Sequence, residues 1–244
     1  WAWRIPLLSA FPLLLIALYL RWSIDETPVF KELVATNQRV KYPFIEIFKK
    51  APLAILIAVG GGVLGHGSYT LMNTYTTNYG VEVLGYAAME FTMALTIGSL
   101  LQLITIPAFG ALANRFGSAR VVGWGALGTL LAAFPLYWFI LDATFLTLVL
   151  IMVVGGILPT ASWAALGGMM GDLFDEKARY TALAVSYNIA AALAATLPFF
   201  LTLMRVQTDN AWWHPGIVLA GLSAITLVAA YAAMRRKSVF SSQA

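Results

Sequence analysis

Long apolar runs separated by short polar connections repeat along most of the 244-residue chain. A helix needs roughly 20 apolar residues to cross the hydrocarbon core of a bilayer. The segments that meet this length are Trp3–Trp22, Pro52–Tyr75, Met89–Leu112, Val121–Leu141, Phe145–Met170, Thr181–Met204 and Pro215–Met234. The pattern therefore predicts an all-α, polytopic membrane protein in which successive helices run antiparallel.

One long polar stretch interrupts this pattern, at residues 25–50. It predicts a cytoplasmic linker that carries a short amphipathic helix. The expected organisation is a first transmembrane helix at 1–22, a linker at 23–51, a six-helix transmembrane bundle at 52–237 and a cytoplasmic tail at 238–244. The chain starts WAWRIPLLSA, with neither an initiator methionine nor a signal peptide. We therefore expect an N-terminal portion to precede it.

Lysine and arginine recur in every second connection between the predicted spans. The basic connections hold Arg21, Lys31, Arg39, Lys41, Lys49 and Lys50, then Arg115 and Arg120, then Lys177 and Arg179, and finally Arg235, Arg236 and Lys237. The connections between them hold Glu82, Glu90, Asp142 and the lone Arg205. Because cytoplasmic loops carry an excess of basic residues, this alternation predicts a cell-membrane protein, in the plasma or inner membrane, with a cytoplasmic C-terminus.

Composition narrows the chemistry. Only 11% of the residues are charged and the mean hydropathy is +0.80, whereas soluble domains carry about a quarter charged residues. There is no cysteine and there are only two histidines, so we expect no metal site and no cofactor. In a membrane protein a net charge of +4 reflects the basic residues of the cytoplasmic loops, so we expect no nucleic-acid partner. The expected partner is the lipid bilayer.

The second span contains an unusually polar stretch, GHGSYTLMNTYTTNYG, at residues 65–80. Helical spacing places five of its side chains on one face: His66, Tyr69, Thr70, Asn73 and Thr77. Such groups are costly in lipid, so the stripe should face protein or water. Interhelical hydrogen bonding is one explanation. A solvated lining that a ligand can reach is the explanation we favour for five polar side chains in register.

Other spans offer single candidates for contact with a ligand. Gln102 lies deep in the third span, Trp163 in the fifth, and Tyr187 and Asn188 in the sixth. Taken one at a time, such residues more often make helix packing contacts. The small-residue spacings Gly61-x-x-x-Gly65 and Gly167-x-x-x-Gly171 would let helices approach closely.

The connection FGALANRFGSARVVG, residues 109–123, resembles the loop motif of the major facilitator superfamily, G-x-L-x-D-R-x-G-R-R, in its second-half copy. The matching positions are Gly110, Leu112, Arg115 and Gly117. Asn114 takes the usual aspartate position, Ser118 and Ala119 replace the paired basic residues, and Arg120 follows. Glycines allow a tight turn, and an arginine there can pair with an acid or a helix C-terminus.

Two further stretches resemble the metabolite:proton symporters, the relatives of the shikimate, alpha-ketoglutarate, citrate and proline/betaine carriers. Residues 3–30 contain W-R-I-P and end in E-T-P-V-F, as in the sixth helix and central loop of that family. Residues 171–187, GDLFDEKARYTALAVSY, are similar to its motif between helices ten and eleven. There Asp172 takes the acidic position, Phe174, Arg179, Tyr180, Thr181 and Tyr187 match, and Asp175 and Ala182 replace proline and glycine.

The resemblance implies helix six, the central loop and the C-terminal six-helix bundle of a major facilitator fold. It places the polar stripe on helix seven, beside the central cavity. It implies symport of a small polar metabolite, an organic acid or a zwitterion, with protons, by alternating access against an N-terminal six-helix half. A cytoplasmic gate would then comprise Gly110, Asn114, Arg115, Gly117, Arg120, Asp172 and Arg179, with Arg115, Asp172 and Arg179 forming a charge cluster.

Two other classes of function compete with transport. A membrane scaffold derived from a carrier would use the polar stripe for packing alone. An intramembrane enzyme is disfavoured, because the chain has no H-E-x-x-H, no G-x-S-x-G and no paired intramembrane aspartates. We therefore expect no enzymatic activity.

Overall fold

The computed structural model describes residues 4–23, 43–174 and 179–236. The chain divides into two units, Trp1–Lys41 and Tyr42–Ala244. The first unit holds α1 (Arg4–Ser23), an apolar helix at the first predicted span, although its apolar part Leu7–Ser23 is shorter than the spans of the second unit. The E-T-P-V-F motif, Lys177 and the expected tail lie outside the described residues.

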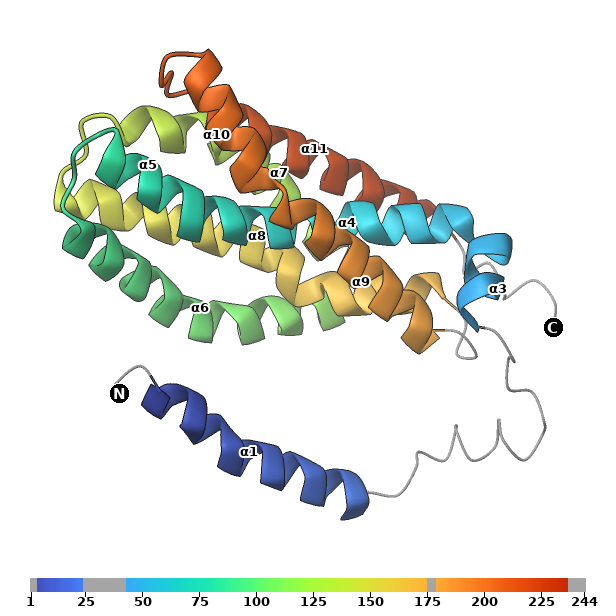
Figure 1. Cartoon of the computed structure of the whole chain (residues 1–244). Coiled ribbons are helices and arrows are strands. Elements are labelled where there is room, and N and C mark those ends of the chain that lie inside the picture. Colours follow the sequence, from blue (N-terminus) through green and yellow to red (C-terminus); the bar gives the residue numbers. More distant parts are fainter. Residues whose placement is uncertain (1–3, 24–42, 175–178, 237–244) are drawn as a thin grey trace, which may run out of the picture. The chain divides into compact units, whose positions relative to one another are not determined.

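The second unit is a bundle of long helices (Figure 1). After α3 (Pro43–Lys50) come α4 (Pro52–Thr70), η1 (Leu71–Thr76), α5 (Thr77–Glu82), α6 (Ala88–Phe116), α7 (Ser118–Phe139), α8 (Phe145–Leu173), α9 (Arg179–Ala195), α10 (Leu197–Gln207) and α11 (His214–Arg235). Over the described residues these form six helical segments long and apolar enough to cross a membrane, and no strand occurs there. The predicted all-α bundle is thus confirmed.

The short helix expected in the linker is α3. Ile47 is buried, whereas Phe48, Lys49 and Lys50 are exposed, so this helix packs through Ile47 and exposes its two basic residues. A helical hydrogen bond from the amide of Ala51 to the carbonyl of Ile47, 2.9 Å, spans the junction between α3 and α4.

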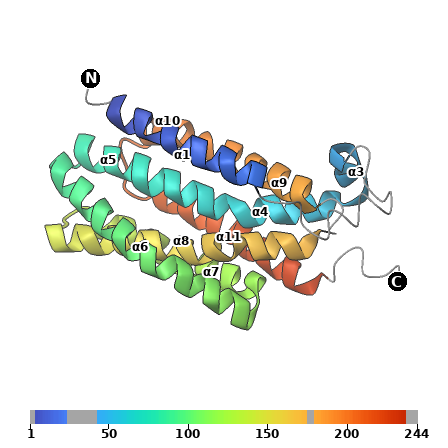
Figure 2. The ribbon, with the colours of Figure 1, turned by 90° about the horizontal axis from the view of Figure 1, so that it is seen from below.

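One predicted span boundary is wrong. The second span ends at Glu82 and not at Tyr75, because η1 and α5 extend α4 in the same direction (Figure 2). Its polar end is accommodated by partners within the bundle: Thr76 is fully buried, and its hydroxyl lies 2.7 Å from that of Tyr137 on α7. The predicted sixth span is found as Arg179–Gln207, but its helix is interrupted at Thr196, between α9 and α10.

α4 lies at the centre of the packing, against α8, α9 and α11. Its glycines allow this, since a Cβ on Gly61 would overlap Met169 of α8 and a Cβ on Gly65 would overlap the Trp163 ring. The second small-residue spacing makes no such contact, because a Cβ on Gly167 or Gly171 would meet nothing within 4 Å among the described atoms. The expectation of a close helix approach there is wrong.

A threonine joins α11 to the backbone of α4. The hydroxyl of Thr226 donates to the carbonyl of Gly60, 2.8 Å, and accepts from the amide of Leu64, 3.3 Å. Apolar side chains then gather in two clusters, one toward each end of α4. We call the end of the bundle with Arg115, Asp172 and Arg235 the basic end, and the end with Glu82 and His214 the opposite end.

Candidate functional site

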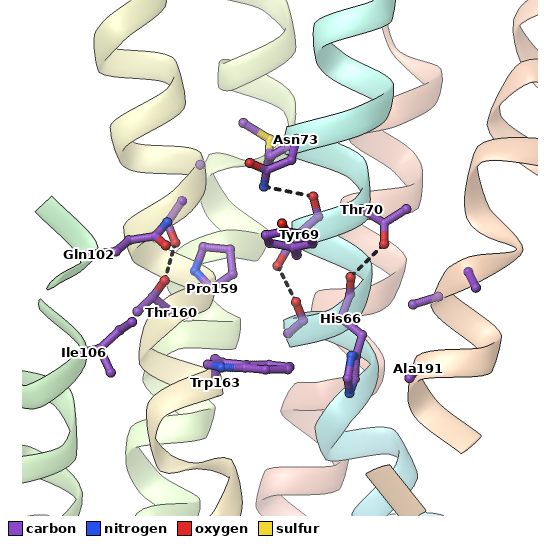
Figure 3. Close-up of a pocket in the computed structure, with 17 residues that line it drawn as sticks. His66, Tyr69, Thr70, Asn73, Gln102, Ile106, Pro159, Thr160, Trp163 and Ala191 are labelled. Atoms are coloured by element: carbon purple, nitrogen blue, oxygen red, sulfur yellow. Dashed lines mark hydrogen bonds between the residues drawn. The ribbon is translucent and has the colours of Figure 1, made fainter. Parts of the chain in front are cut away.

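A cavity of about 440 Å³ lies between α4, η1, α6, α8 and α9. Its lining comprises Gly65, His66, Ser68, Tyr69, Thr70, Met72, Asn73, Gln102, Ile106, Gly155, Gly156, Pro159, Thr160, Trp163, Ala191, Ala194 and Ala195. Figure 3 shows His66, Tyr69 and Asn73 on α4 and η1 opposite Gln102 of α6, with Thr160 and Trp163 of α8 beside them. The volume falls within the range of about 300–1,000 Å³ typical of small-molecule sites.

The cavity lies at mid-depth of the bundle. Gln102 is the central residue of the 29-residue span Ala88–Phe116, and Pro159 is the central residue of the 29-residue span Phe145–Leu173. His66 lies one residue from the middle of Pro52–Glu82, which has 31 residues. Polar groups at this depth are costly unless they face protein or water, and here they line a hollow.

The helical backbone is irregular at the same level. η1 is a π-helical segment inside the α4–α5 span, and such segments occur frequently at functional sites. Pro159 of α8 has no N–H, so the carbonyl of Gly155 loses its usual helical partner. Pro198, just past the α9–α10 break, does the same to Ala194. Irregular backbone at membrane depth is tolerated where it lines a cavity, and both Gly155 and Ala194 belong to the lining.

Three aromatic rings lie together on the side of the cavity nearest the basic end, and His66 and Trp163 among them line it. The His66 ring stands edge-on to Trp163 and Tyr187, with centroid distances of 4.8 and 4.4 Å. The His66 Nε2 atom is buried and has no hydrogen-bond partner in the described structure. Trp163 and Tyr187 also contact each other, at 5.8 Å. We call these three side chains the aromatic partition.

A second hollow, of about 590 Å³, lies beyond the aromatic partition between α8 and α9. Its lining comprises Trp163, Leu166, Gly167, Met170, Tyr180, Leu183, Ala184, Tyr187 and Asn188. Trp163 is common to both linings. The partition therefore separates a mid-depth cavity from a hollow nearer the basic end.

The structure groups most of the candidate ligand residues. His66, Tyr69, Thr70, Asn73, Gln102 and Trp163 line the first cavity. Tyr187 and Asn188 line the second. Thr77 lines neither, because a π-helical segment advances about one extra residue per turn and shifts the face that follows it.

Sequence reasoning missed two polar lining residues, Ser68 and Thr160, as well as the prolines. The hydroxyl of Thr160 donates to the carbonyl of Gly156, 2.8 Å, one turn back in α8. That of Ser68 donates to the carbonyl of Gly65, 3.2 Å. The dipeptide Pro159-Thr160 in the middle of an apolar span was the available signal.

The residues of the expected cytoplasmic gate lie near the basic end but do not form the expected charge cluster. No ion pair joins Arg115, Asp172 and Arg179 within the described residues. Instead, the Cζ of Arg115 lies 5.2 Å from the centroid of the Phe116 ring, and Arg179 donates to the carbonyl of Phe174, 3.2 Å. Asp172 is exposed. Arg179 thus satisfies a carbonyl at the end of α8, which is the other role open to a cation there, whereas Arg115 contacts an aromatic ring.

The remaining gate candidates lie in and around the turn between α6 and α7. Gly117 has φ +94°, a conformation that favours glycine, and it ends α6 immediately before α7 begins. Arg120 donates to the carbonyl of Phe116, 3.1 Å. Gly110 and Asn114 lie in the last two turns of α6, and a Cβ on Gly110 would meet nothing within 4 Å.

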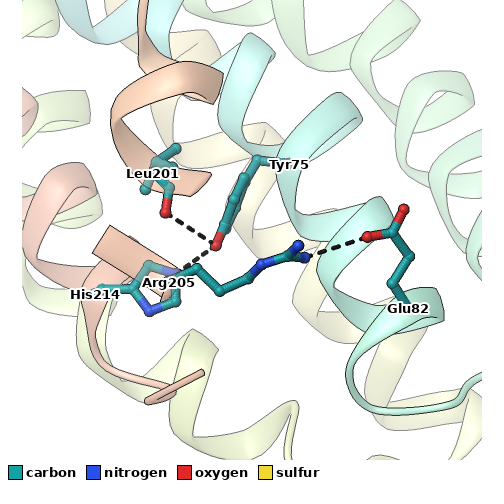
Figure 4. A network of polar contacts seen from close by, with 5 residues as sticks. All are labelled: Tyr75, Glu82, Leu201, Arg205 and His214. Atoms are coloured by element: carbon teal, nitrogen blue, oxygen red, sulfur yellow. Dashed lines mark hydrogen bonds and ion pairs between the residues drawn. The ribbon is translucent and has the colours of Figure 1, made fainter. Parts of the chain in front are cut away.

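Polar contacts join η1 and α5 to α10 and α11 at the opposite end of the bundle (Figure 4). His214 Nδ1 contacts the carbonyl of Ala211, and its Nε2 contacts the hydroxyl of Tyr75. Because a carbonyl only accepts, Nδ1 carries the proton, and in the neutral ring Nε2 accepts from Tyr75. Nearby, Arg205 pairs with Glu82 at 3.2 Å. The network connects three spans just beyond the cavity.

We expect Tyr75→Phe to lower the free energy of unfolding by about 1–3 kcal/mol, since it leaves the buried Nε2 of His214 without a partner. Thermal unfolding of the purified protein in detergent measures this. Tyr231→Phe, at a half-exposed position on α11, is the matched control and should be neutral. Equal stability of the Tyr75 and Tyr231 variants would contradict the hydrogen-bonding pattern.

The amino-acid sequence matches a known family. The family model "Major Facilitator Superfamily" matches residues 82–243. The chain belongs to the Major Facilitator Superfamily. The superfamily match and the six spans confirm the predicted family and its C-terminal bundle. No solved structure matches the chain.

Relatives named as transporters align with nearly the whole chain. The inner membrane metabolite transport protein YhjE of Escherichia coli is 27% identical, over 94% of this chain and 53% of the relative. The glycine betaine/proline/ectoine/pipecolic acid transporter OusA of Dickeya dadantii is 26% identical, over 93% of this chain and 47% of the relative. The proline/betaine transporter of Salmonella typhimurium is 25% identical, over 93% and 47%. The chain therefore spans about half the length of the curated relatives it matches.

Proposed function

We propose that this chain is the C-terminal half of a secondary transporter that moves a small polar metabolite by alternating access. An N-terminal six-helix half would complete the solute path. The transporter names of the superfamily relatives support this assignment. The proposed boundaries are the first span at 1–22, the central loop at 23–51, the bundle at 52–237 and a cytoplasmic tail at 238–244 in the plasma or inner membrane.

The observation that carries the proposal is the uncharged polar cavity at mid-depth. Its lining has hydroxyl, amide, imidazole and indole groups but, among the described residues, no aspartate, glutamate, lysine or arginine. A solute with a net charge would need a counter-charge at this depth. A zwitterion, whose own charges compensate each other, fits this half of the site better than an organic acid does. We therefore propose a zwitterionic solute.

Gating in this proposal depends on the aromatic partition. The rings of His66, Trp163 and Tyr187 separate the two hollows, so rotation of one ring would join them. The gate residues near the α6–α7 and α8–α9 turns would move with the helix ends that they cap. Alternation of the bundle against its partner half would open the basic end, which we place in the cytoplasm from the charge pattern.

Proton coupling is the finer part of the proposal. His66 is a titratable residue at mid-depth in the lining, and its Nε2 has no hydrogen-bond partner among the described groups. A histidine can exchange a proton near neutral pH. We propose that His66 accepts a proton when solute binds, which would make the transporter a symporter.

Uptake of labelled glycine betaine and proline tests the site, in cells or proteoliposomes that contain this half together with its N-terminal half. We expect Gln102→Ala to raise KM about tenfold, the effect of losing one hydrogen bond of roughly 1.4 kcal/mol. Thr96→Ala is the matched control on α6, since Thr96 is exposed, bonds only to the carbonyl of Thr92 and lies outside the cavity lining. An unchanged KM for Gln102→Ala, or an equal rise for Thr96→Ala, would contradict the site. No uptake of any zwitterion would contradict the proposed solute class.

A further inference from the structure

A separate groove of about 610 Å³ runs between α4, α9 and α11 toward the basic end. Its lining comprises Leu53, Leu56, Ile57, Val59, Gly60, Val63, Leu193, Ile225, Val228, Ala229, Ala232, Arg235 and Arg236. It shares no lining residue with either hollow of the proposed solute path. Apart from the two arginines, every lining side chain is aliphatic or absent.

The groove has the length of one membrane leaflet. Its lining on α11 runs from Ile225 to Arg235, a rise of ten steps, or about 15 Å at 1.5 Å per residue. The hydrocarbon core of a bilayer is about 30 Å thick, so a single leaflet contributes about 15 Å. The aliphatic part of the groove therefore lies at acyl-chain depth, and Arg235 and Arg236 lie where lipid headgroups begin.

The arginines give the groove a charged end. Arg236 Nη1 is buried and has no hydrogen-bond partner in the described part of the chain. The Cζ of Arg235 lies 4.4 Å from the centroid of the Tyr231 ring, which orients that guanidinium. A buried guanidinium donor without a partner is costly, and arginine binds phosphate through two parallel hydrogen bonds.

The groove is preformed by backbone packing. Gly60 lines it, and a Cβ there would come within 3.1 Å of the Cβ of Ala229, so α4 and α11 are in close contact beneath the groove. The hydroxyl of Thr226 bonds to the carbonyl of Gly60 and fixes this contact. The apolar surface beneath the groove is therefore already rigid, and a ligand that binds there does not bear the entropic cost of ordering it.

We propose that this groove binds one anionic phospholipid, with an acyl chain along α4 and α11 and the phosphate on Arg235 and Arg236. Charge complementarity selects an anionic headgroup, and the aliphatic walls require an acyl chain in addition to the phosphate. The site is independent of the proposed solute path. The lipid would brace α4, which carries the polar cavity, against α11.

Native mass spectrometry of the purified protein, with phosphatidylglycerol or phosphatidylcholine added in detergent, tests the headgroup. We expect preferential retention of phosphatidylglycerol, and an affinity about tenfold lower in the double variant Arg235→Gln/Arg236→Gln. The matched control, Arg115→Gln/Arg120→Gln, removes two charges at the same end of the bundle but outside the groove. Equal loss in both double variants would overturn the site in favour of general surface attraction.

A second pair of variants tests the acyl chain. Val228→Trp fills the groove, whereas Leu131→Trp adds the same ring at an equally exposed position on α7; the two residues are 68% and 70% exposed. Only the first should reduce phosphatidylglycerol retention. Inorganic phosphate should not compete for the site, because it has no acyl chain. Competition by phosphate, or full retention in Val228→Trp, would overturn the proposal.

Discussion

Replacing Trp163 with alanine is expected to reduce concentrative uptake to background while downhill exchange of the same solute continues. The indole ring is the one side chain that lines both the cavity of about 440 Å³ and the hollow of about 590 Å³. Gly65 lies directly beneath the ring, so no other side chain of α4 can take its place at that position. Removal of the ring would join the cavity and the hollow. The solute could then pass toward the basic end whether or not the transporter had changed conformation, so it would not accumulate.

Two assays on proteoliposomes that contain both halves of the transporter separate this outcome from a general loss of function. Gradient-driven accumulation measures coupling, and counterflow of labelled proline or glycine betaine measures passage. Trp163→Phe keeps an aromatic ring beside His66 and should retain most of the accumulation. Trp124→Ala is the matched control, since Trp124 is half exposed on α7 and contacts Phe116. Normal accumulation by Trp163→Ala would show that the partition does not control the path.

Hydropathy and loop charge were sufficient to locate the spans, because the bilayer sets the length of an apolar span and the side on which basic loops lie. Neither depends strongly on tertiary contacts. The centres of all six spans in the bundle were predicted correctly, and so was α3. The polar stripe was recognised because His66, Tyr69 and Asn73 follow a helical period in an otherwise apolar segment. These signals are local, so a single sequence contains them.

The errors in the second and sixth spans and in the polar stripe have a common physical cause, which is backbone irregularity. Polar residues after Tyr75 indicated the end of a span, but Thr76 and Tyr79 find partners on α7 and in the α10–α11 connection. A π-helical segment has no simple sequence signature, so the shift that takes Thr77 away from the cavity could not be anticipated. Pro198 indicated the break at Thr196, but the prediction used hydropathy alone, which shows no interruption there.

The charge cluster failed for a different reason. Sequence places Arg115, Asp172 and Arg179 at one end of the bundle, yet an ion pair also requires side-chain direction. Exposed ion pairs contribute only about 0–1 kcal/mol. A helix-terminal carbonyl such as that of Phe174 competes with a carboxylate on nearly equal terms for an exposed arginine. Proximity in the topology was therefore predictable, and pairing was not.

The contact between α7 and α8 should be the part of the bundle least tolerant of added volume. A Cβ on Gly125 would come within 2.7 Å of the backbone nitrogen of Ser162 and within 2.9 Å of the Cβ of Ala161. A backbone nitrogen and a Cβ cannot move away by a change of rotamer, as the end of a long side chain can. The hydroxyl of Ser162 also donates to the carbonyl of Val122, 2.9 Å, and holds the two helices at this distance.

We expect Gly125→Ala to lower the free energy of unfolding by about 3 kcal/mol, the upper end of the usual cost of overpacking. In thermal unfolding this corresponds to a loss of about 6–12 °C in Tm for a chain of this size. Gly128→Ala, one turn along α7, is the control. Its Cβ would meet only the flexible Leu158, at 3.2 Å, and the gain of about 1 kcal/mol in helix propensity should offset that contact. A similar Tm for both variants would mean that α7 and α8 can separate at little cost, and that rigid packing of these two helices does not hold Trp163 in place.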